Sequence, residues 1–346
     1  MKAFTGEQHK NIVGYNQVRA ASRDHQAFSS ALQGDRDVRS YRQLPLESDP
    51  PEHTSYRHAI QPLFLRPKLE SHAPAFRQLA EELLAKIEGK EPLDVYLDLA
   101  LPYVVGCLGI IYNRPQDVAR WQAWGHDVWT AESEIRSGNT LHTYLEEVWA
   151  EESADDVWAY IKSSNPSGAQ LTKEEFFGYS SVLLAGGRDT VIKLITGIVW
   201  HLLNNSRDLL AVRTDGERER NLISELLRFL SPLPAIERIK PDQFEEENPI
   251  YYRLHFASAN HDPEIWDSPL EINIYRGKQP HLAFGYGPHA CIGMNLAEYE
   301  AKAFCRAFVE VASKFSLVDW EVELSEADGY KYVSNLKNVK IALNGS

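Results

Sequence analysis

The stretch FGYGPHACIG, residues 284–293, decides the fold, because it sets one cysteine among glycines directly before a predicted helix. Glycines at Gly285, Gly287 and Gly293 favour positive φ angles or a close approach of the backbone to another group. The sequence that follows, MNLAEYEAKAFCRAFVEVASKF, repeats apolar residues at the spacing of a long amphipathic helix. Cys291 is therefore expected at or just before a helix N-terminus, where unpaired N–H groups and the helix dipole favour an anion and lower a thiol's pKa. This environment favours a thiolate ligand.

Other interpretations of this loop remain open from its residues alone. A glycine-rich turn around a buried structural cysteine fits the same pattern. A disulfide-exchange or nucleophilic cysteine is less well supported, because no second cysteine lies near enough to form a CxxC motif. A zinc site is also poorly supported, because His289 and Cys291 lack a second pair of ligands at the usual spacing.

A long apolar segment lies earlier in the chain. Thr172 and Glu175 have the spacing of a capping box and open a run predicted to be one helix as far as about Leu203. A helix that is apolar on most faces passes through the middle of a protein. The consecutive Gly186 and Gly187 each cost about 1 kcal/mol in a helix interior. We therefore expect either a closely packed neighbouring helix there or a flat, bulky group against the backbone.

The remaining sequence predicts a single domain over residues 1–346, mainly α with a small β portion. The 346 residues, 43% of them hydrophobic, are sufficient for a large core. Helical patterns cover residues 51–64, 69–87 and the region around Trp121, and strand-like pieces cover residues 251–256 and 339–343.

Composition limits the partners and the compartment. The net charge of −13 argues against nucleic acid, whose phosphates require clustered Lys and Arg. No apolar run approaches the ~18 residues of a membrane span, and none follows Lys2, so neither a transmembrane helix nor a secretory signal is expected. The cysteines are odd in number and widely spaced, which indicates reduced thiols in a cytoplasmic protein. Cys107 and Cys305 lie in apolar or helical patterns and are expected in the core.

The loop resembles the haem-binding loop of cytochromes P450, which is written FGxGxHxCxG in the soluble bacterial members. The resemblance implies a P450 fold, and it makes Cys291 the thiolate ligand of a haem b iron, which favours cleavage of the O–O bond. It also implies that Phe284 covers the sulfur, that His289 lies near a haem propionate, and that Gly293 belongs to the haem site.

Two further motifs match groups that bind the propionates in this family. His53 and Arg57 lie at i and i+4 on one helix face and resemble the HTxxR-type helix, in which the arginine can bond a carboxylate bidentately. Arg238 matches a second propionate-binding arginine. Taken alone, a pair such as His53 and Arg57 is more often part of a charged surface.

The motifs expected behind the cysteine loop are also present in the family's order. Glu225 and Arg228 resemble the ExxR pair, and Arg276 has the spacing of its third member, which implies a largely buried ion network that positions the loop. Residues 260–263, NHDP, are similar to the family's NRDP segment. His261 replaces the usual arginine, so the resemblance supports the turn and assigns no role to that side chain.

The sequence GGRDT, residues 186–190, resembles the family's (A/G)Gx(D/E)T signature. The resemblance implies that Gly186 and Gly187 leave room for dioxygen and substrate above the iron. Thr190 would hold a proton-delivering water network and Asp189 would relay protons from solvent, a kind of help typically worth about 10²–10⁴ in rate. The alternative is a threonine that bonds back to its own helix carbonyl and an aspartate in a salt bridge.

Together these motifs imply a haem-thiolate monooxygenase that oxidises a hydrophobic small molecule with O2. No redox domain is fused to the chain, so electrons are expected from a separate ferredoxin and ferredoxin reductase. A P450-type desaturase or oxidative-coupling enzyme fits the same residues. A non-catalytic haem scaffold or sensor is the alternative from another class, and the Asp189–Thr190 pair argues against it.

The resemblance departs from the family before Asn11 and between Arg238 and Asn260, where this chain is shorter. Both losses fall on the β portion, which predicts a smaller or more open β region that a second subunit could cover. The substrate is not indicated: Trp121, Trp124 and Trp129 could roof a pocket or belong to the core, and residues 330–334 correspond to the family's final substrate-contact region.

Overall fold

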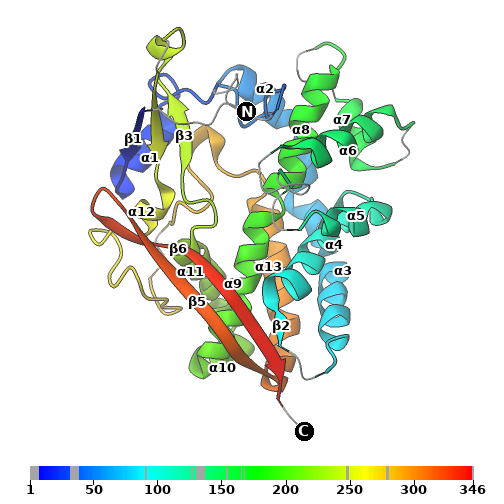
Figure 1. Ribbon diagram of the computed structural model, residues 1–346, viewed down its shortest axis with the longest axis vertical. Helices are drawn as coiled ribbons and strands as arrows, with labels where there is room; N and C mark the ends of the chain where they lie inside the picture. Colours follow the sequence, from blue (N-terminus) through cyan, green and yellow to red (C-terminus); the bar gives the residue numbers. More distant parts are fainter. Residues whose placement is uncertain are drawn as a thin grey trace.

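Helices form most of the computed structural model, with two small sheets at their side (Figure 1). The structure describes residues 8–31, 39–89, 92–125, 128–129, 137–152, 155–164, 166, 168–246, 249–277 and 280–344. The α-helices within these residues are α1 Tyr15–Arg23, α2 Glu52–Ile60, α3 Arg66–Ala85, α4 Leu101–Ile111, α5 Val118–Ala123, α6 Asn139–Ala150, α7 Val157–Lys162, α8 Lys173–Gly186, α9 Asp189–Asn204, α10 Ser206–Thr214, α11 Gly216–Leu230, α12 Phe256–Asn260 and α13 Met294–Val311. The helical patterns expected from the sequence correspond to α2, α3 and α5.

The two sheets are small and lie at different places. In the first, β1 Gln8–Ile12 pairs in parallel with β4 Ile250–Leu254, which pairs antiparallel with β3 Ile236–Ile239. In the second, β5 Phe315–Ala327 and β6 Tyr330–Leu343 form a long antiparallel hairpin, and β2 Leu93–Asp94 pairs antiparallel with β6. The mainly α architecture with a small β portion is therefore confirmed.

The central apolar segment differs from the single helix that its sequence predicts. The capping box at Thr172 and Glu175 is present, with both hydrogen bonds formed, and it begins α8. However, α8 ends at Gly186 and α9 begins at Asp189, so the expectation of one helix is wrong. Because glycine weakens a helix, the pair of glycines is a natural place for the break. At the break, the Tyr112 hydroxyl donates to the Leu183 carbonyl at 3.0 Å.

Helix α9 lies in the middle of the molecule, beside α13 and α11 (Figure 1). Its buried residues cover most of its faces, as expected for a helix that crosses a core. Helix α13 also packs against α3, and its buried residues include Cys305, as expected. The packing of α13 against α3, α9 and α11 fixes the position of its N-terminus, which the cysteine loop directly precedes.

Among the helices that the structure describes, none is both long enough and apolar enough to cross a membrane.

Candidate functional site

Cys291 lies between the short 3₁₀ helix Gly287–His289 and α13. Its amide donates to the Phe284 carbonyl at 2.8 Å, and the Gly285 amide donates to the Leu282 carbonyl at 2.9 Å, so the loop folds back on itself. Gly285 and Gly287 have φ angles of 67° and 74°, as their sequence positions predict. At Gly293 neither expectation is met: its φ is negative, and a Cβ there would lie 3.8 Å from the Cys291 Sγ, an ordinary van der Waals contact.

The thiol is accessible although protein surrounds it. Cys291 is exposed, whereas Cys107 and Cys305 are buried. Burial nevertheless raises the pKa of Cys291, and the Gly293 amide and the charge of Arg57 oppose this rise without reversing it. The expectation that the helix N-terminus lowers the pKa of Cys291 is therefore wrong for the protein alone, because removal from water penalises the thiolate more than these groups favour it. A coordinated metal ion would supply the missing positive charge.

Gly287 brings the loop against α1. A Cβ at this position would lie 2.6 Å from the Ser22 carbonyl oxygen and 3.1 Å from the Arg23 Cα, both backbone atoms. The loop and α1 can therefore meet only if residue 287 has no side chain.

Replacing Gly287 with alanine is expected to destabilise the protein by more than replacing Gly285 does. Both positions have positive φ, which costs alanine about 1–2 kcal/mol. At Gly285 a Cβ meets atoms no closer than 3.7 Å, so only Gly287→Ala adds a backbone clash. Urea unfolding of the two variants measures the difference. Equal losses would show that α1 and the loop separate easily.

Two histidines and a serine gather beside the loop. The rings of His53, on α2, and His289 lie 4.2 Å apart, and the Ser30 Oγ lies 3.0 Å from the His289 Nε2. Burial, aided by nearby arginines, lowers the pKa of His53 to about 4 and that of His289 to about 2. The His53 Nε2 is buried and has no hydrogen-bond partner among the described residues. A buried polar atom without a partner among the described residues is suited to bind a polar group of a ligand.

Two arginines lie near these neutral histidines and supply the positive charge. Burial lowers the pKa of Arg57, and a negative charge at Cys291 opposes that shift, so the two side chains interact electrostatically. Arg238, on β3, is 5% exposed; burial lowers its pKa to about 10, and Asp49 opposes the shift. Asp49 and Ser30 carry no motif, so the sequence did not indicate them. The Asp49 carboxylate accepts the Ser30 amide at 2.9 Å.

This arrangement fits a haem. The accessible thiol would bind the iron, and His53, His289, Arg57 and Arg238 bring imidazole and guanidinium groups to one side of it, which suits the carboxylates of haem. The helix face predicted to carry His53 and Arg57 therefore lies near His289 and Cys291 of the loop. Phe284 is partly buried against the core, and its ring lies 5.8 Å from that of His281.

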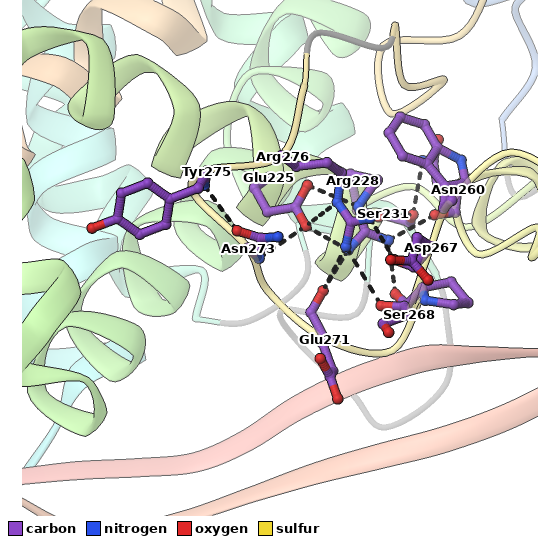
Figure 2. Close-up of polar contacts among 12 residues, drawn as sticks. Glu225, Arg228, Ser231, Asn260, Asp267, Ser268, Glu271, Asn273, Tyr275 and Arg276 are labelled. Atoms are coloured by element: carbon purple, nitrogen blue, oxygen red, sulfur yellow. Dashed lines mark hydrogen bonds and ion pairs between the residues drawn. The ribbon is translucent and has the colours of Figure 1, made fainter.

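The predicted ion network behind the loop is present (Figure 2). The Arg228 Nε and Nη2 bind the two carboxylate oxygens of Glu225 at 2.9 and 2.8 Å. Arg276 Nε joins the same carboxylate at 3.0 Å. Arg228 also donates to the carbonyls of Asn260, Pro269 and Glu271, so its buried guanidinium holds several turns of the chain at once.

Asn260 connects this network to the cysteine loop. Its carbonyl accepts from Arg228 at 2.9 Å, and its side-chain oxygen accepts the Leu282 amide at 2.7 Å, next to the start of the loop. His261, where the family pattern has arginine, is 1% exposed and bonds to the Ala257 carbonyl at 2.9 Å. Burial lowers the pKa of His261 to about 4, so it acts as a neutral core residue.

The GGRDT segment occupies the break between α8 and α9. A Cβ on Gly186 would meet nothing within 4 Å, whereas one on Gly187 would lie 2.9 Å from the Leu183 carbonyl oxygen and 3.3 Å from the Leu108 side chain. One glycine therefore borders open space and the other is closely packed. The Thr190 hydroxyl bonds back to the Gly186 carbonyl at 3.1 Å, and Asp189 pairs with Arg188. These are the contacts expected if Thr190 bonds back to its own helix and Asp189 forms a salt bridge, without a role in proton delivery.

The tryptophans near α5 are buried. Trp121, Trp124 and Trp129 are 1%, 5% and 6% exposed, and the rings of Trp121 and Trp124 pack edge-on against Tyr144. These contacts are those of core residues.

Comparisons with known proteins agree with this site. The family model described as Cytochrome P450 matches residues 220–318. The putative cytochrome P450 YjiB of Bacillus subtilis strain 168 is 26% identical over 314 residues, 84% of this chain and 78% of that protein. The cytochrome P450 monooxygenase PikC of Streptomyces venezuelae is 26% identical over 324 residues, 86% of this chain and 77% of that protein. The solved structure titled "The structure of a carbohydrate active P450" has a TM-score of 0.83 and 28% identity, covering 96% of this chain and 92% of that one.

The family model, the bacterial relatives and the solved structure all indicate a bacterial cytochrome P450. The chain is therefore a haem-iron oxidoreductase, a monooxygenase that uses O2 and electrons from a redox partner.

Proposed function

We propose that this protein is a haem-thiolate monooxygenase in which Cys291 binds the iron of haem b. Substrate R–H, O2, two electrons and two protons give R–OH and water. The observation that carries the proposal is an accessible thiol embedded in protein, with the histidine and arginine cluster directly beside it. We further propose that residues 1–346 form one haem domain.

Bound haem supplies the O–O bond cleavage, and the side chains supply the ligand, the access and the protons. His53, Arg57, Arg238 and His289 bind the propionates, and the unpartnered His53 Nε2 gains a partner in this way. Phe284 shields the sulfur, and Gly293 lies next to it in the haem site. Gly186 borders the open space that O2 and substrate need, and Gly187 allows α8 to end beside α4.

Asp189 and Thr190 deliver protons in this proposal. Thr190 is partly exposed at the break between the helices, and its hydroxyl can leave the Gly186 carbonyl to bond water. Asp189 has a side chain that is 30% exposed, so it can exchange protons with solvent.

Thr190→Ala is expected to keep haem and its spectrum while product per electron pair falls about 10-fold and hydrogen peroxide rises in proportion, because a proton donor is lost. The matched control is Thr196→Ala. Thr196 also bonds back to a carbonyl of α9, that of Ile192 at 2.9 Å, but it is 3% exposed in the core. Product and peroxide are measured per electron consumed. Equal coupling in both variants would remove Thr190 from proton delivery.

The electron source in this proposal is a ferredoxin with its reductase, and the substrate is a hydrophobic small molecule. One solved relative is titled a carbohydrate active P450, so carbohydrates belong in the substrate panel beside hydrophobic small molecules. The free cysteines are compatible with the cytoplasm, where thiols stay reduced. A second subunit over the β region is a further part of the proposal, tested by the mass of the protein in solution.

The deciding experiment scores a ligand panel by the haem spectral shift that accompanies loss of water from the iron, then measures O2 uptake with a surrogate ferredoxin. Hydroxylated product supports the monooxygenase, and an alkene or a coupled product supports the desaturase or coupling alternative. Absence of reduction and turnover with every ligand that binds would favour the scaffold.

A further inference from the structure

Arg188 is a buried arginine at the break between α8 and α9. It is 1% exposed. Its Nη1 lies 3.1 Å from the Oδ1 of Asp189, and its Nη2 donates to the backbone carbonyl of Gly125, just after α5. Its Nε is buried and has no hydrogen-bond partner among the described residues. The guanidinium therefore joins the end of α5 to the first carboxylate of α9.

The local structure gives no reason for arginine at this position. Arg188 is the N-cap of α9, where an acceptor side chain is preferred, and it makes no capping hydrogen bond. A positive charge near a helix N-terminus is also disfavoured by the helix dipole, and burial of a guanidinium is costly. Residues that break local rules in this way concentrate at functional sites.

The position of Arg188 allows its guanidinium to contact the Asp189 carboxylate. Asp189 lies in the first turn of α9, so the side chains of consecutive residues would ordinarily diverge. Here the guanidinium turns back to meet the carboxylate. Lys193, one turn further along α9, is a second nearby cation, but its Nζ is directed at the Pro232 carbonyl, 3.4 Å away. Lys193 supplies charge near Asp189, whereas Arg188 supplies a directed contact.

We propose that Arg188 is a positioning residue that holds the Asp189 carboxylate in its proton-delivering orientation and ties that orientation to the end of α5. The proposal rests on the proposed function, in which Asp189 relays protons. Loss of Arg188 would remove this directed contact from the Asp189 carboxylate, while Lys193 would keep part of the charge balance.

The test compares Arg188→Gln, Arg188→Lys and Asp189→Asn in the holoenzyme. Turnover driven by O2 and electrons needs delivered protons, whereas hydrogen peroxide supplied in their place brings its own protons and gives R–OH and water. Arg188→Gln is expected to lower O2-driven product per O2 consumed by about 3- to 10-fold, less than the full worth of a proton donor. Peroxide-driven turnover is expected to stay within about 2-fold of the parent. Arg188→Lys should recover part of the coupling.

A second arm uses the carbonyl of Gly125. Gly125 has φ +69°, and a Cβ there meets nothing within 4 Å among the described residues, so Gly125→Ala mainly strains the backbone that carries this carbonyl. Gly89→Ala is the matched control, because Gly89 has φ +90° and the same open surroundings at the end of α3. Gly125→Ala should lower O2-driven coupling, and Gly89→Ala should not. Faster amide hydrogen exchange in α5 is expected for Arg188→Gln and not for Asp189→Asn, which leaves the Gly125 contact in place.

The outcomes separate the two proposals. Coupling lost in Asp189→Asn and unchanged in Arg188→Gln would overturn the role of Arg188 and leave the proposed function standing. Equal loss of O2-driven and peroxide-driven turnover in Arg188→Gln would reduce Arg188 to a structural residue. Full coupling in Asp189→Asn would remove the proton relay itself. If Arg188→Gln does not retain haem, Arg188→Lys and the glycine pair decide: coupling unchanged in Arg188→Lys and in Gly125→Ala would overturn the inference.

Discussion

Replacing Cys291 with serine is expected to abolish the thiolate-type spectrum of the reduced, CO-bound protein. A serine hydroxyl does not ionise as a thiol does, so it cannot supply the electron density that a thiolate gives to iron. The loop itself should persist, because the amide of residue 291 bonds to the Phe284 carbonyl through backbone atoms alone. Changes to groups that only support a metal ligand cost about 10–100-fold in affinity or activity, and loss of the ligand should cost more.

The matched control is Cys305→Ala. Cys305 lies on α13, beyond the loop, and it is fully buried in the core. Its replacement should lower the free energy of unfolding by about 1–2 kcal/mol through lost packing, without changing the spectrum. Spectra of the reduced, CO-bound variants measure the difference. A thiolate-type spectrum that survives in Cys291→Ser would show that another group binds the iron.

Much of the site could be predicted because its motifs depend on residue type and on spacing within short stretches of sequence. The glycines of the cysteine loop have the positive φ angles that their pattern predicts, and His53 and Arg57 share a helix face that meets the loop. The Glu225–Arg228 pair also follows from helical spacing. Spacing along the chain places each of these two pairs on one helix face, and the resemblance to the family implied which of them would lie near the loop.

Other features depend on the tertiary structure and could not be predicted. At the break after Gly186, the hydroxyl of Tyr112, the residue that follows α4, donates to the Leu183 carbonyl of α8, a contact between segments far apart in the sequence. The raised pKa of Cys291 depends on how much protein surrounds the thiol, which no motif encodes. Arg188 stands at the variable position of the (A/G)Gx(D/E)T signature, so the resemblance implied no role for it. Its burial between Gly125 and Asp189 appears only in the folded chain.

The second large effect is expected at Arg228, where the ion network holds the cysteine loop. Arg228→Met removes a 1% exposed guanidinium and leaves Glu225 and the carbonyls of Asn260, Pro269 and Glu271 without this donor. Breaking a buried ion pair from one side costs about 3–5 kcal/mol, because the remaining charge is left in a poor environment. Haem retention should fall together with stability, because Asn260 links Arg228 to Leu282, next to the start of the loop, through two hydrogen bonds.

Arg120→Met is the control, because it removes an arginine that pairs with a carboxylate in the same way but at an exposed site. Arg120 also binds both carboxylate oxygens of one partner, Glu147, but the two side chains are 39% and 51% exposed. An exposed pair of this kind contributes about 0–1 kcal/mol. Urea unfolding of the two variants, with haem content measured on the same samples, should therefore show a loss several times larger for Arg228→Met. Similar losses would mean that the Arg228 network adds no more than a surface pair, and the loop would then owe its position to the packing of α13 and α1.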